Sequence, residues 1–220
     1  MQETIKENLL RIQEEIAPYR PNIIAVTKYF DENAIISAYE AGLRDFAESR
    51  VIEASEKIDN LPQEIKKNST FHFIGHLQTN KVKRVIEVFE YIHSVDSIKL
   101  AEKISEEASK IGKVQKILIQ INNANEEQKF GFSPDKVFED FGRIINLKNL
   151  KVVGVMNMAP FGAKEEELEK LFSEIAEIKT QLEQQFDCKL DEISMGMSQD
   201  YKVAARAGST MLRIGRKLFK

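Results

Sequence analysis

The sequence predicts an α/β fold: a single (β/α)8 barrel of the TIM type that fills residues 1–220 as one domain, with an extra helix at its N-terminus. Three observations support this prediction. Strand-like and helix-like segments alternate along the chain, which is typical of a parallel sheet with helical crossovers. Eight strand units favour a closed barrel over an open doubly wound sheet, which is the alternative fold. No linker rich in Pro, Gly or Ser divides the sequence.

Eight short runs are the expected strands. Most are rich in Val, Ile, Leu or Phe and are bounded by polar or turn-forming residues, as buried parallel strands are. They are residues 23–27, 45–47, 71–74, 91–95, 116–121, 151–156, 192–194 and 210–214. The chain of 220 residues is shorter than the roughly 250 that are typical of this fold, so we expect short loops.

Helices are expected between these strands. Before the first strand, Ile5, Leu9, Ile12 and Ile16 recur at helical spacing and predict the extra N-terminal helix. Residues that favour the start of a helix precede several of the others, namely Asp31, Asp96, Ser133 with Pro134, and Asp200. The longest helix is expected over residues 168–182, where apolar side chains share one face.

Composition and charge narrow the classes of protein to which this chain can belong. The formal net charge is −3, so no global basic field indicates nucleic-acid binding. Cys188 is the one cysteine, which excludes a disulfide within the chain and fits a reducing cytoplasm. No apolar stretch has the length of a signal-peptide core or a membrane span. We therefore expect a cytoplasmic protein that binds neither nucleic acid nor membrane.

Lys28 stands at the C-terminal end of the first expected strand. Barrel proteins of this type carry their chemistry at that edge. A lysine there can lose its water shell, which favours the neutral amine, and a neutral amine can form a Schiff base. A solvated lysine just past a strand is the simpler interpretation, so the assignment depends on what else lies at this edge.

The loops after the seventh and eighth strands are a candidate phosphate site. Ser194, Gly196, Met197 and Ser198 follow the seventh strand, and Gly215 follows the eighth. Barrels often bind phosphate between these loops, where backbone N–H groups at the start of a short helix point at the anion and glycine permits close approach. The alternative is a structural turn whose methionines belong to the core.

A lysine and a phosphate site that face each other across one barrel mouth suit a ligand with an aldehyde and a phosphate. Pyridoxal 5′-phosphate (PLP) is such a ligand. Arg213, late in the eighth strand, could meet the pyridine nitrogen, and its permanent charge would keep that nitrogen unprotonated. A salt bridge at the barrel rim is the alternative for Arg213. Asn157 follows the sixth strand at the same edge and joins the predicted ligand set.

Three histidines raise the alternative of a metal-dependent barrel hydrolase. His72 and His76 lie at the end of the third strand, and His93 lies in the fourth. Barrel metal sites usually also use carboxylates at strand ends, and here those ends carry Lys, Asn and Ser. We therefore expect no metal site and interpret His72 as a core histidine with satisfied hydrogen bonds.

Several stretches of the chain resemble the pyridoxal phosphate homeostasis protein family, a group similar to the N-terminal barrel of alanine racemase. The resemblance extends from about Ile23 to Phe219. The most specific matches are residues 25–28, 72–81, 119–122 with Glu126, Lys129 and Gly131, 154–156, 194–200 and 207–215.

The resemblance implies a barrel that holds PLP as an internal aldimine on Lys28, with phosphate contacts from the loop at 194–198 and the loop at Gly215. It also implies a role in PLP supply and in balancing vitamin B6 and amino-acid pools, without an established turnover reaction. PLP is then the small-molecule partner, and PLP-requiring apo-enzymes are the candidate acceptors. We expect a monomer.

The chain departs from the family pattern in three places. Ser49 replaces a usual asparagine and could make one of its hydrogen bonds to the cofactor. Arg216 replaces a usual small hydroxyl residue, and it either makes a charge-assisted contact with phosphate or points away. Phe219 and Lys220 stand where the family has a Phe-Gly-x-Arg tail.

A PLP-dependent amino-acid racemase is the alternative function. In alanine racemase a tyrosine from a separate C-terminal domain supplies the second acid–base group, and this sequence ends at Lys220, directly after the eighth strand. Arg213 would also weaken the cofactor ring as an electron sink. We therefore expect a protein that binds PLP without racemising amino acids.

Overall fold

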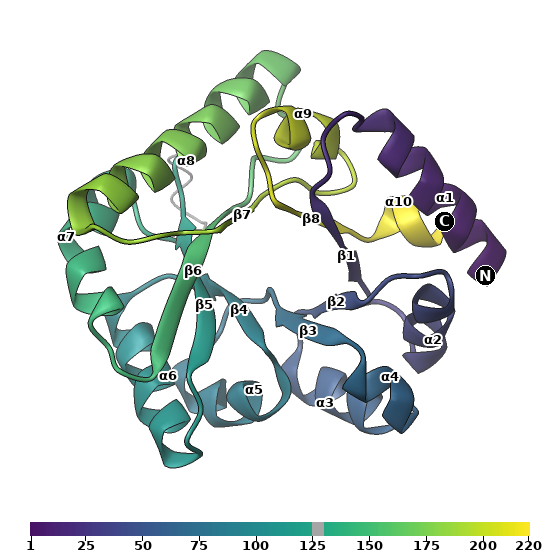
Figure 1. Ribbon diagram of the computed structural model, residues 1–220, viewed down its shortest axis with the longest axis horizontal. Helices are drawn as coiled ribbons and strands as arrows, with labels where there is room; N and C mark the ends of the chain where they lie inside the picture. Colours follow the sequence, from purple (N-terminus) through teal and green to yellow (C-terminus); the bar gives the residue numbers. More distant parts are fainter. Residues whose placement is uncertain (125–129) are drawn as a thin grey trace.

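Eight parallel strands close into a barrel in the computed structural model, which describes residues 1–124 and 130–220 (Figure 1). Each strand pairs with its neighbours in chain order, and β1 pairs with β8 to complete the ring. The strands are β1 (Asn22–Val26), β2 (Asp45–Glu48), β3 (Thr70–Phe73), β4 (Tyr91–Val95), β5 (Gln115–Ile121), β6 (Leu150–Asn157), β7 (Glu192–Ser194) and β8 (Met211–Ile214). The predicted barrel is confirmed, and the open sheet is excluded.

Helices surround the ring of strands, and the predicted extra helix α1 lies beside α10 where the two ends of the chain meet (Figure 1). The helices are α1 (Gln2–Glu15), α2 (Glu32–Glu40), α3 (Val51–Asp59), α4 (Gln63–Lys67), η1 (a 3-10 turn, Thr79–Lys81), α5 (Val82–Val88), α6 (Ile98–Lys110), α7 (Pro134–Ile145), α8 (Glu165–Phe186), α9 (Tyr201–Arg206) and α10 (Arg216–Phe219). The sequence pattern did not indicate the short helix α4.

The starts of the helices follow the sequence signals in part. Ser133 caps α7, because its hydroxyl accepts the backbone N–H of Lys136 at 3.3 Å. Asp31 precedes α2 as predicted, but its side chain makes no capping hydrogen bond. The prediction for Asp96 is wrong by one residue, since the hydroxyl of Ser97 caps α6. Aspartate and serine are both good N-caps, so where the two are adjacent the sequence does not tell which of them caps the helix.

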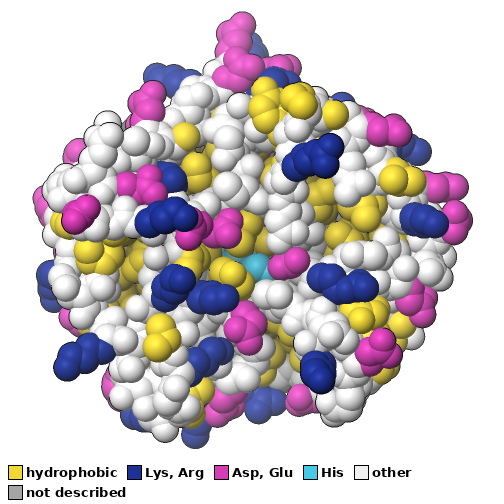
Figure 2. Space-filling view, viewed as in Figure 1, with side chains coloured by type: hydrophobic (Ala, Val, Ile, Leu, Met, Phe, Trp, Pro, Cys, Tyr) yellow, Lys and Arg dark blue, Asp and Glu magenta, His cyan; other side chains and the backbone are white. Residues whose placement is uncertain are grey.

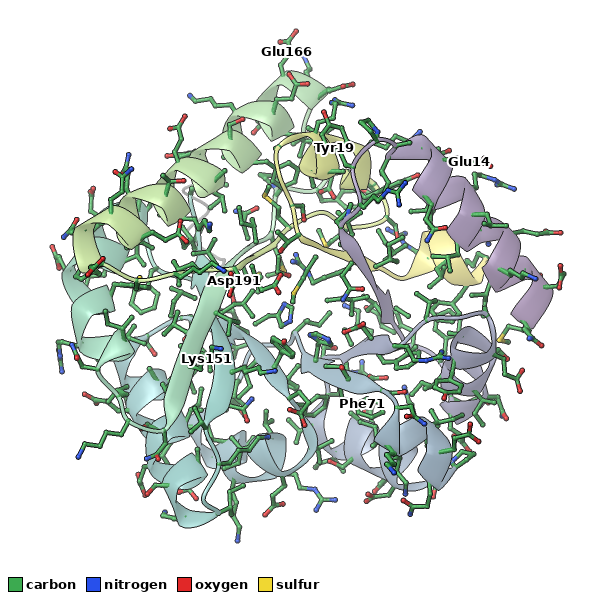
Figure 3. The ribbon with its side chains drawn as sticks, in the orientation of Figure 1. Glu14, Tyr19, Phe71, Lys151, Glu166 and Asp191 are labelled. Atoms are coloured by element: carbon green, nitrogen blue, oxygen red, sulfur yellow. The ribbon has the colours of Figure 1, made fainter. Side chains whose placement is uncertain are left out.

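The strands are buried on both faces. One large apolar core lies between the strands and the helices and includes Phe46, Phe73 and Phe172. Inside the ring the side chains are mixed, and Figure 3 shows them filling its centre. Small apolar clusters there include Ile24 and Met211. Buried polar side chains occupy the rest of the interior, among them His72, His93, Ser194, Asn157 and Arg213.

The helices of the outer layer carry charged residues on their outer faces. Figure 3 shows Glu166, in the first turn of α8, projecting away from the barrel. Three consecutive glutamates in that turn suit the positive end of the helix dipole. Among the described helices, none combines the length and the hydropathy that crossing a membrane requires.

Candidate functional site at the C-terminal edge of the barrel

Lys28 lies in the turn after β1, at the edge of the barrel where the strands end. Its side chain is half-buried, and its Nζ atom lies 5.1 Å from the centroid of the exposed Tyr29 ring. The strand before this turn packs against the β8 turn, because a side chain placed at Gly215 would touch the carbonyl oxygen of Val26. The fold therefore brings the Lys28 turn beside one of the two candidate phosphate loops.

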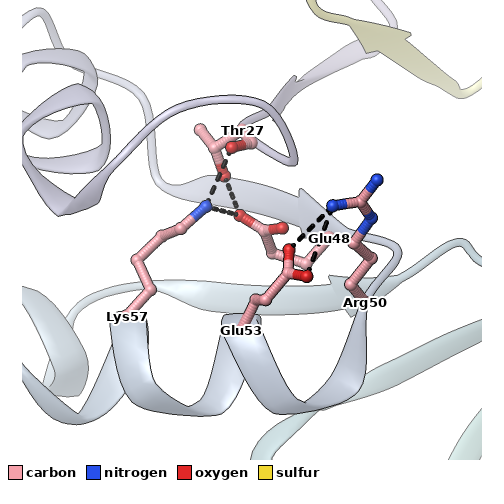
Figure 4. A network of polar contacts seen from close by, with 5 residues as sticks. All are labelled: Thr27, Glu48, Arg50, Glu53 and Lys57. Carbon is pink, nitrogen blue, oxygen red and sulfur yellow. Dashed lines mark hydrogen bonds and ion pairs between the residues drawn. The ribbon is translucent and has the colours of Figure 1, made fainter.

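A buried ion pair anchors the turn that carries Lys28. Figure 4 shows Lys57 reaching from α3 toward Thr27 and Glu48. The Lys57 ammonium donates to Oε1 of Glu48 at 2.5 Å and to the carbonyl oxygen of Thr27 at 2.9 Å. The hydroxyl of Thr27 donates to the same carboxylate oxygen at 2.7 Å. Sequence reasoning missed this anchor, because a strand and a helix meet there at an angle that spacing does not reveal.

The loop after β7 has a shape that requires glycine. Gly196 has φ +91, in the left-handed region, and a side chain there would lie 2.5 Å from Cβ of Ala204 and 2.8 Å from Cδ2 of Leu212. Its carbonyl oxygen accepts the backbone N–H of Arg213 at 3.0 Å. The backbone of this loop is therefore fixed to β8, as close packing of the two loops demands.

Ser198 connects the β7 loop to the start of α10. Its hydroxyl oxygen accepts hydrogen bonds from the backbone N–H groups of Gly215 and Lys217, both at 3.3 Å. Two backbone donors thus converge on the Ser198 oxygen, and a phosphate oxygen that took its place would find the same pair of donors. The structure brings the predicted residues Ser198 and Gly215 together.

Asp200 differs from the prediction. Its carboxylate does not cap α9 but accepts the backbone N–H of Met197 at 2.5 Å, which closes the turn that follows Gly196. Burial raises the pKa of Asp200, and the Met197 hydrogen bond and the charge of Arg213 oppose that effect. The correction makes Asp200 part of the candidate site, where it holds the predicted residue Met197 in place.

Arg213 lies inside the barrel with its guanidinium buried, so the alternative of a rim salt bridge is wrong. One amino group donates to the hydroxyl of Ser194 at 2.6 Å, and the other donates to the carbonyl oxygen of Asn157 at 2.8 Å. Burial lowers the pKa of Arg213 to about 10, so the side chain stays charged at neutral pH. The side-chain oxygen Oδ1 of Asn157 is buried and has no hydrogen-bond partner among the described residues.

Ser49 and Arg216, where the chain departs from the family pattern, both lie at this edge. Ser49 follows β2, and its carbonyl oxygen would lie 2.2 Å from a Cβ at Gly75, so the turns after β2 and β3 are in close contact. Arg216 is exposed at the start of α10 and makes no ion pair with the described residues. Glu126 and Lys129 lie outside the residues that the structure describes.

The histidines form hydrogen bonds with side chains of neighbouring elements. His72 is buried and bonded on both ring nitrogens, to His93 and to Asp45, as expected for a satisfied core histidine. His76 stacks on Phe130 with ring centroids 3.6 Å apart. In residues 1–124 and 130–220, no three His, Cys, Asp or Glu side chains gather as a metal site would require.

Comparison with known proteins agrees with this geometry. The model of the alanine racemase N-terminal domain family matches residues 2–220. A protein of Synechocystis sp. named pyridoxal phosphate homeostasis protein is 41% identical over 208 residues, which cover 94% of each chain. The human protein of that name is 33% identical over 231 residues, covering 99% of this chain and 82% of its own length.

Solved structures show the same fold. The structure of PipY from Synechococcus elongatus PCC7942 with PLP bound has a TM-score of 0.88 and 34% identity, covering 98% of this chain and 100% of PipY. Alanine racemase of Clostridium difficile 630 has a TM-score of 0.82 at 16% identity, covering 99% of this chain and 56% of its own. The closed barrel and its facing loops define a protein of the alanine racemase N-terminal domain class. Within that class, the chain belongs to the pyridoxal phosphate homeostasis protein family.

Proposed function

We propose that this chain binds PLP reversibly through Lys28 and takes part in PLP homeostasis without a turnover reaction. The observation that carries the proposal is the packing of β1, just before Lys28, against the Gly215 turn, which Ser198 joins to the β7 loop. Support also comes from PipY, a relative of known structure with PLP bound. Lys28 supplies the amine that condenses with the aldehyde of PLP, and the condensation releases one water molecule.

The residues present fit the chemical groups of PLP. The N–H groups of Gly215 and Lys217, with the hydroxyl of Ser198, suit a phosphate. The buried, unpartnered Oδ1 of Asn157 suits a hydrogen-bond donor on the ligand, since an unpaired buried acceptor costs free energy. Arg213 is a charged donor that suits a pyridine nitrogen with a free lone pair. We propose Ser194, Gly196, Met197 and Ser49 as the further members of the site.

Arg213 supports binding over catalysis. Bound PLP acts as an electron sink for carbanions, and it does so best when its ring nitrogen is protonated. A guanidinium that stays charged at neutral pH disfavours a second positive charge beside it. We therefore propose that the protein does not racemise amino acids efficiently, although its barrel has the fold of alanine racemase.

Exchange of PLP with PLP-requiring apo-enzymes is the role that this site suits. Lys28 is half-buried rather than enclosed, and it stands at the open edge of the barrel. We propose that the barrel is one domain and acts as a monomer. The single cysteine, Cys188, supports a place in the reducing cytoplasm.

Labelling tests the proposal directly. Purified protein is mixed with PLP, reduced with borohydride, digested and mapped by mass spectrometry. The label is expected on Lys28 and is expected to disappear in Lys28→Ala. Lys81→Ala is the matched control, since Lys81 is a half-buried lysine after β3 at the same edge. A label on Lys57 or Lys81, or on no lysine, would refute the role of Lys28.

A racemisation assay separates the two candidate functions. PLP-loaded protein is incubated with L-alanine, and the D-enantiomer is measured. We expect no conversion above that of free PLP, because Arg213 weakens the electron sink. Rapid conversion that is lost in Lys28→Ala would establish the racemase alternative instead.

A further inference from the structure

A line of hydrogen bonds crosses the interior of the barrel from β2 to β8. Oδ1 of Asp45 lies 2.9 Å from Nε2 of His72, and Nδ1 of His72 lies 2.9 Å from Nε2 of His93. Nδ1 of His93 lies 2.9 Å from the hydroxyl of Ser194, which accepts from Arg213 at 2.6 Å. We refer to Asp45, His72, His93, Ser194 and Arg213 as the interior chain.

The interior chain reaches the surface at one end. His72, His93 and Ser194 are fully buried and Arg213 is 3% exposed, whereas the side chain of Asp45 is 20% exposed. Asp45 is the first residue of β2, so it lies at the opposite edge of the barrel from the Lys28 turn. Figure 2 shows charged side chains of both signs spread over this face of the molecule, with a small histidine surface near its centre. The chain thus joins the two ends of the barrel.

The acceptor at the Asp45 end fixes the direction of the hydrogen bonds. A carboxylate can only accept, so His72 carries its proton on Nε2 and donates it to Asp45. Nδ1 of His72 is then an acceptor, so His93 carries its proton on Nε2 and donates to it. Nδ1 of His93 in turn accepts the proton of the Ser194 hydroxyl, whose oxygen accepts from the donor-only Arg213.

The reverse direction fails at Asp45. If Nδ1 of His93 and Nδ1 of His72 carried the protons, the lone pair of His72 Nε2 would face the Asp45 carboxylate at 2.9 Å. Two acceptors would then face each other, and the Ser194 proton would lose its partner on His93. Burial, His72 and Arg213 together lower the pKa of His93 well below its usual value, which keeps that ring neutral.

We propose that the interior chain is a one-way hydrogen-bond relay in which Asp45, His72 and His93 are positioning residues for the guanidinium of Arg213. The carboxylate at one end of the barrel sets the proton positions of both imidazoles, and these hold Ser194 as an acceptor for Arg213. The proton arrangement is a property of the protein alone. Its effect on a ligand beside Arg213 rests on the proposed function.

Imidazole ¹⁵N NMR of the PLP-free protein tests the relay itself. His72 and His93 are expected as single Nε2–H tautomers at neutral pH. In Asp45→Ala, which removes the final acceptor, both rings are expected to become tautomer mixtures. Asp45→Asn, which keeps an acceptor oxygen, should restore the single tautomers. Asp191→Ala is the matched control, because Asp191 is a carboxylate just before β7 with no contact to the chain.

Two NMR results on the PLP-free protein would refute the relay. A proton on Nδ1 of either ring in the unmodified protein would overturn the relay. Unchanged tautomers in Asp45→Ala would overturn it as well. His76 serves as an internal reference, since its side chain is 38% exposed and lies outside the interior chain.

PLP titration tests whether the relay affects a ligand beside Arg213. Asp45→Ala is expected to weaken PLP binding by about twofold to 150-fold, the range for residues coupled in one hydrogen-bonded network, and to shift the absorbance of bound PLP. Asp45→Asn should recover most of the affinity, and Asp191→Ala should leave it unchanged. Altered tautomers with unchanged affinity and absorbance would refute the effect of the relay on PLP. Absence of PLP binding in the unmodified protein would refute the proposed function together with that effect. The NMR experiment on the PLP-free protein would still test the relay.

Discussion

Lys57 donates a hydrogen bond to the carbonyl oxygen of Thr27 at 2.9 Å, directly before Lys28 in the chain. The same ammonium pairs with Glu48, and the two side chains are only 10% and 3% exposed. A helix thus holds the backbone of the turn that presents the candidate PLP lysine (Figure 4). The position of Lys28 depends on a residue that is far from it in sequence.

Lys57→Met should destabilise the fold and weaken PLP binding. Removing one partner of a buried ion pair leaves an unpaired charge and costs about 3–5 kcal/mol of unfolding free energy. Urea unfolding measures that cost, and PLP titration measures the effect on the Lys28 turn. The double variant Glu48→Gln with Lys57→Met should recover part of the stability, because it leaves no buried charge.

Arg50→Ala is the matched control for that prediction. Arg50, directly before α3, and Glu53 in its first turn form an ion pair with the two side-chain atoms 3.1 Å apart, but their side chains are 61% and 60% exposed. Exposed pairs contribute about 0–1 kcal/mol. A similar loss of stability in Arg50→Ala and Lys57→Met would contradict the distinction drawn between the two pairs.

Gly196→Ala should lower the unfolding free energy by more than the strain of its backbone conformation alone accounts for. Gly196 and Gly208 have nearly the same φ, +91 and +92, but only at Gly196 would the new methyl group collide with Ala204 and Leu212. We expect Gly208→Ala to cost about 1–2 kcal/mol from conformation. Gly196→Ala should cost about 1–3 kcal/mol more, from overpacking. Equal losses in thermal or urea unfolding would show that the loop adapts to the methyl group.

Stability should decline in mild acid because His93 is buried in its neutral form. The unfolded chain takes up a proton on this ring near pH 6.5, whereas the folded protein, with its lowered pKa, does not. The unfolded state therefore binds more protons below about pH 6.5, and the unfolding free energy falls by up to about 1.4 kcal/mol per pH unit as the pH drops. His93→Gln should reduce that slope between pH 6.5 and 5. His76→Gln should not, if burial is the cause.

Arg216→Thr tests the most visible departure from the family pattern. Arg216 is exposed and unpaired among the described residues, so its loss should leave stability unchanged. If the side chain contacts the phosphate, PLP affinity should fall about fivefold, the equivalent of one modest hydrogen bond. Arg206→Thr is the control, since Arg206 pairs with Glu165 and Glu169. Equal PLP affinity in both variants would mean that Arg216 points away.

The barrel could be predicted from the sequence because each strand is a short apolar run followed by a helix signal. Ser133 and Pro134 illustrate this, since both act within one turn of α7 and need no distant partner. Asp200 illustrates the limit. Its carboxylate could accept a hydrogen bond either from an N–H group in the first turn of α9 or from the N–H of Met197. The turn after Gly196 brings the Met197 N–H within reach, and the carboxylate binds that group. Side-chain hydrogen bonds of this kind compete with capping.

The contacts that organise the interior could not be predicted from the sequence. His72 was expected to be a satisfied core histidine, but its bond to His93 depends on the register between β3 and β4, where His72 lies opposite Tyr91. Ser194 reaches His93 only because the barrel closes. Such contacts join strands across the ring, and no regular spacing of residues in the sequence indicates them.

The pairing of β1 with β8 joins Ile23 to Leu212. During synthesis β1 emerges before the other strands of the barrel, and one of its two edges has no partner until β8 has been made. An exposed strand edge is a template for other chains, so the nascent protein is prone to aggregation until β8 has emerged and paired with β1. Ring closure also makes folding slow, because its contacts span almost the entire sequence. Slower induction or a chaperone that shields β1 should therefore raise the yield of recombinant protein more than changes to the finished surface.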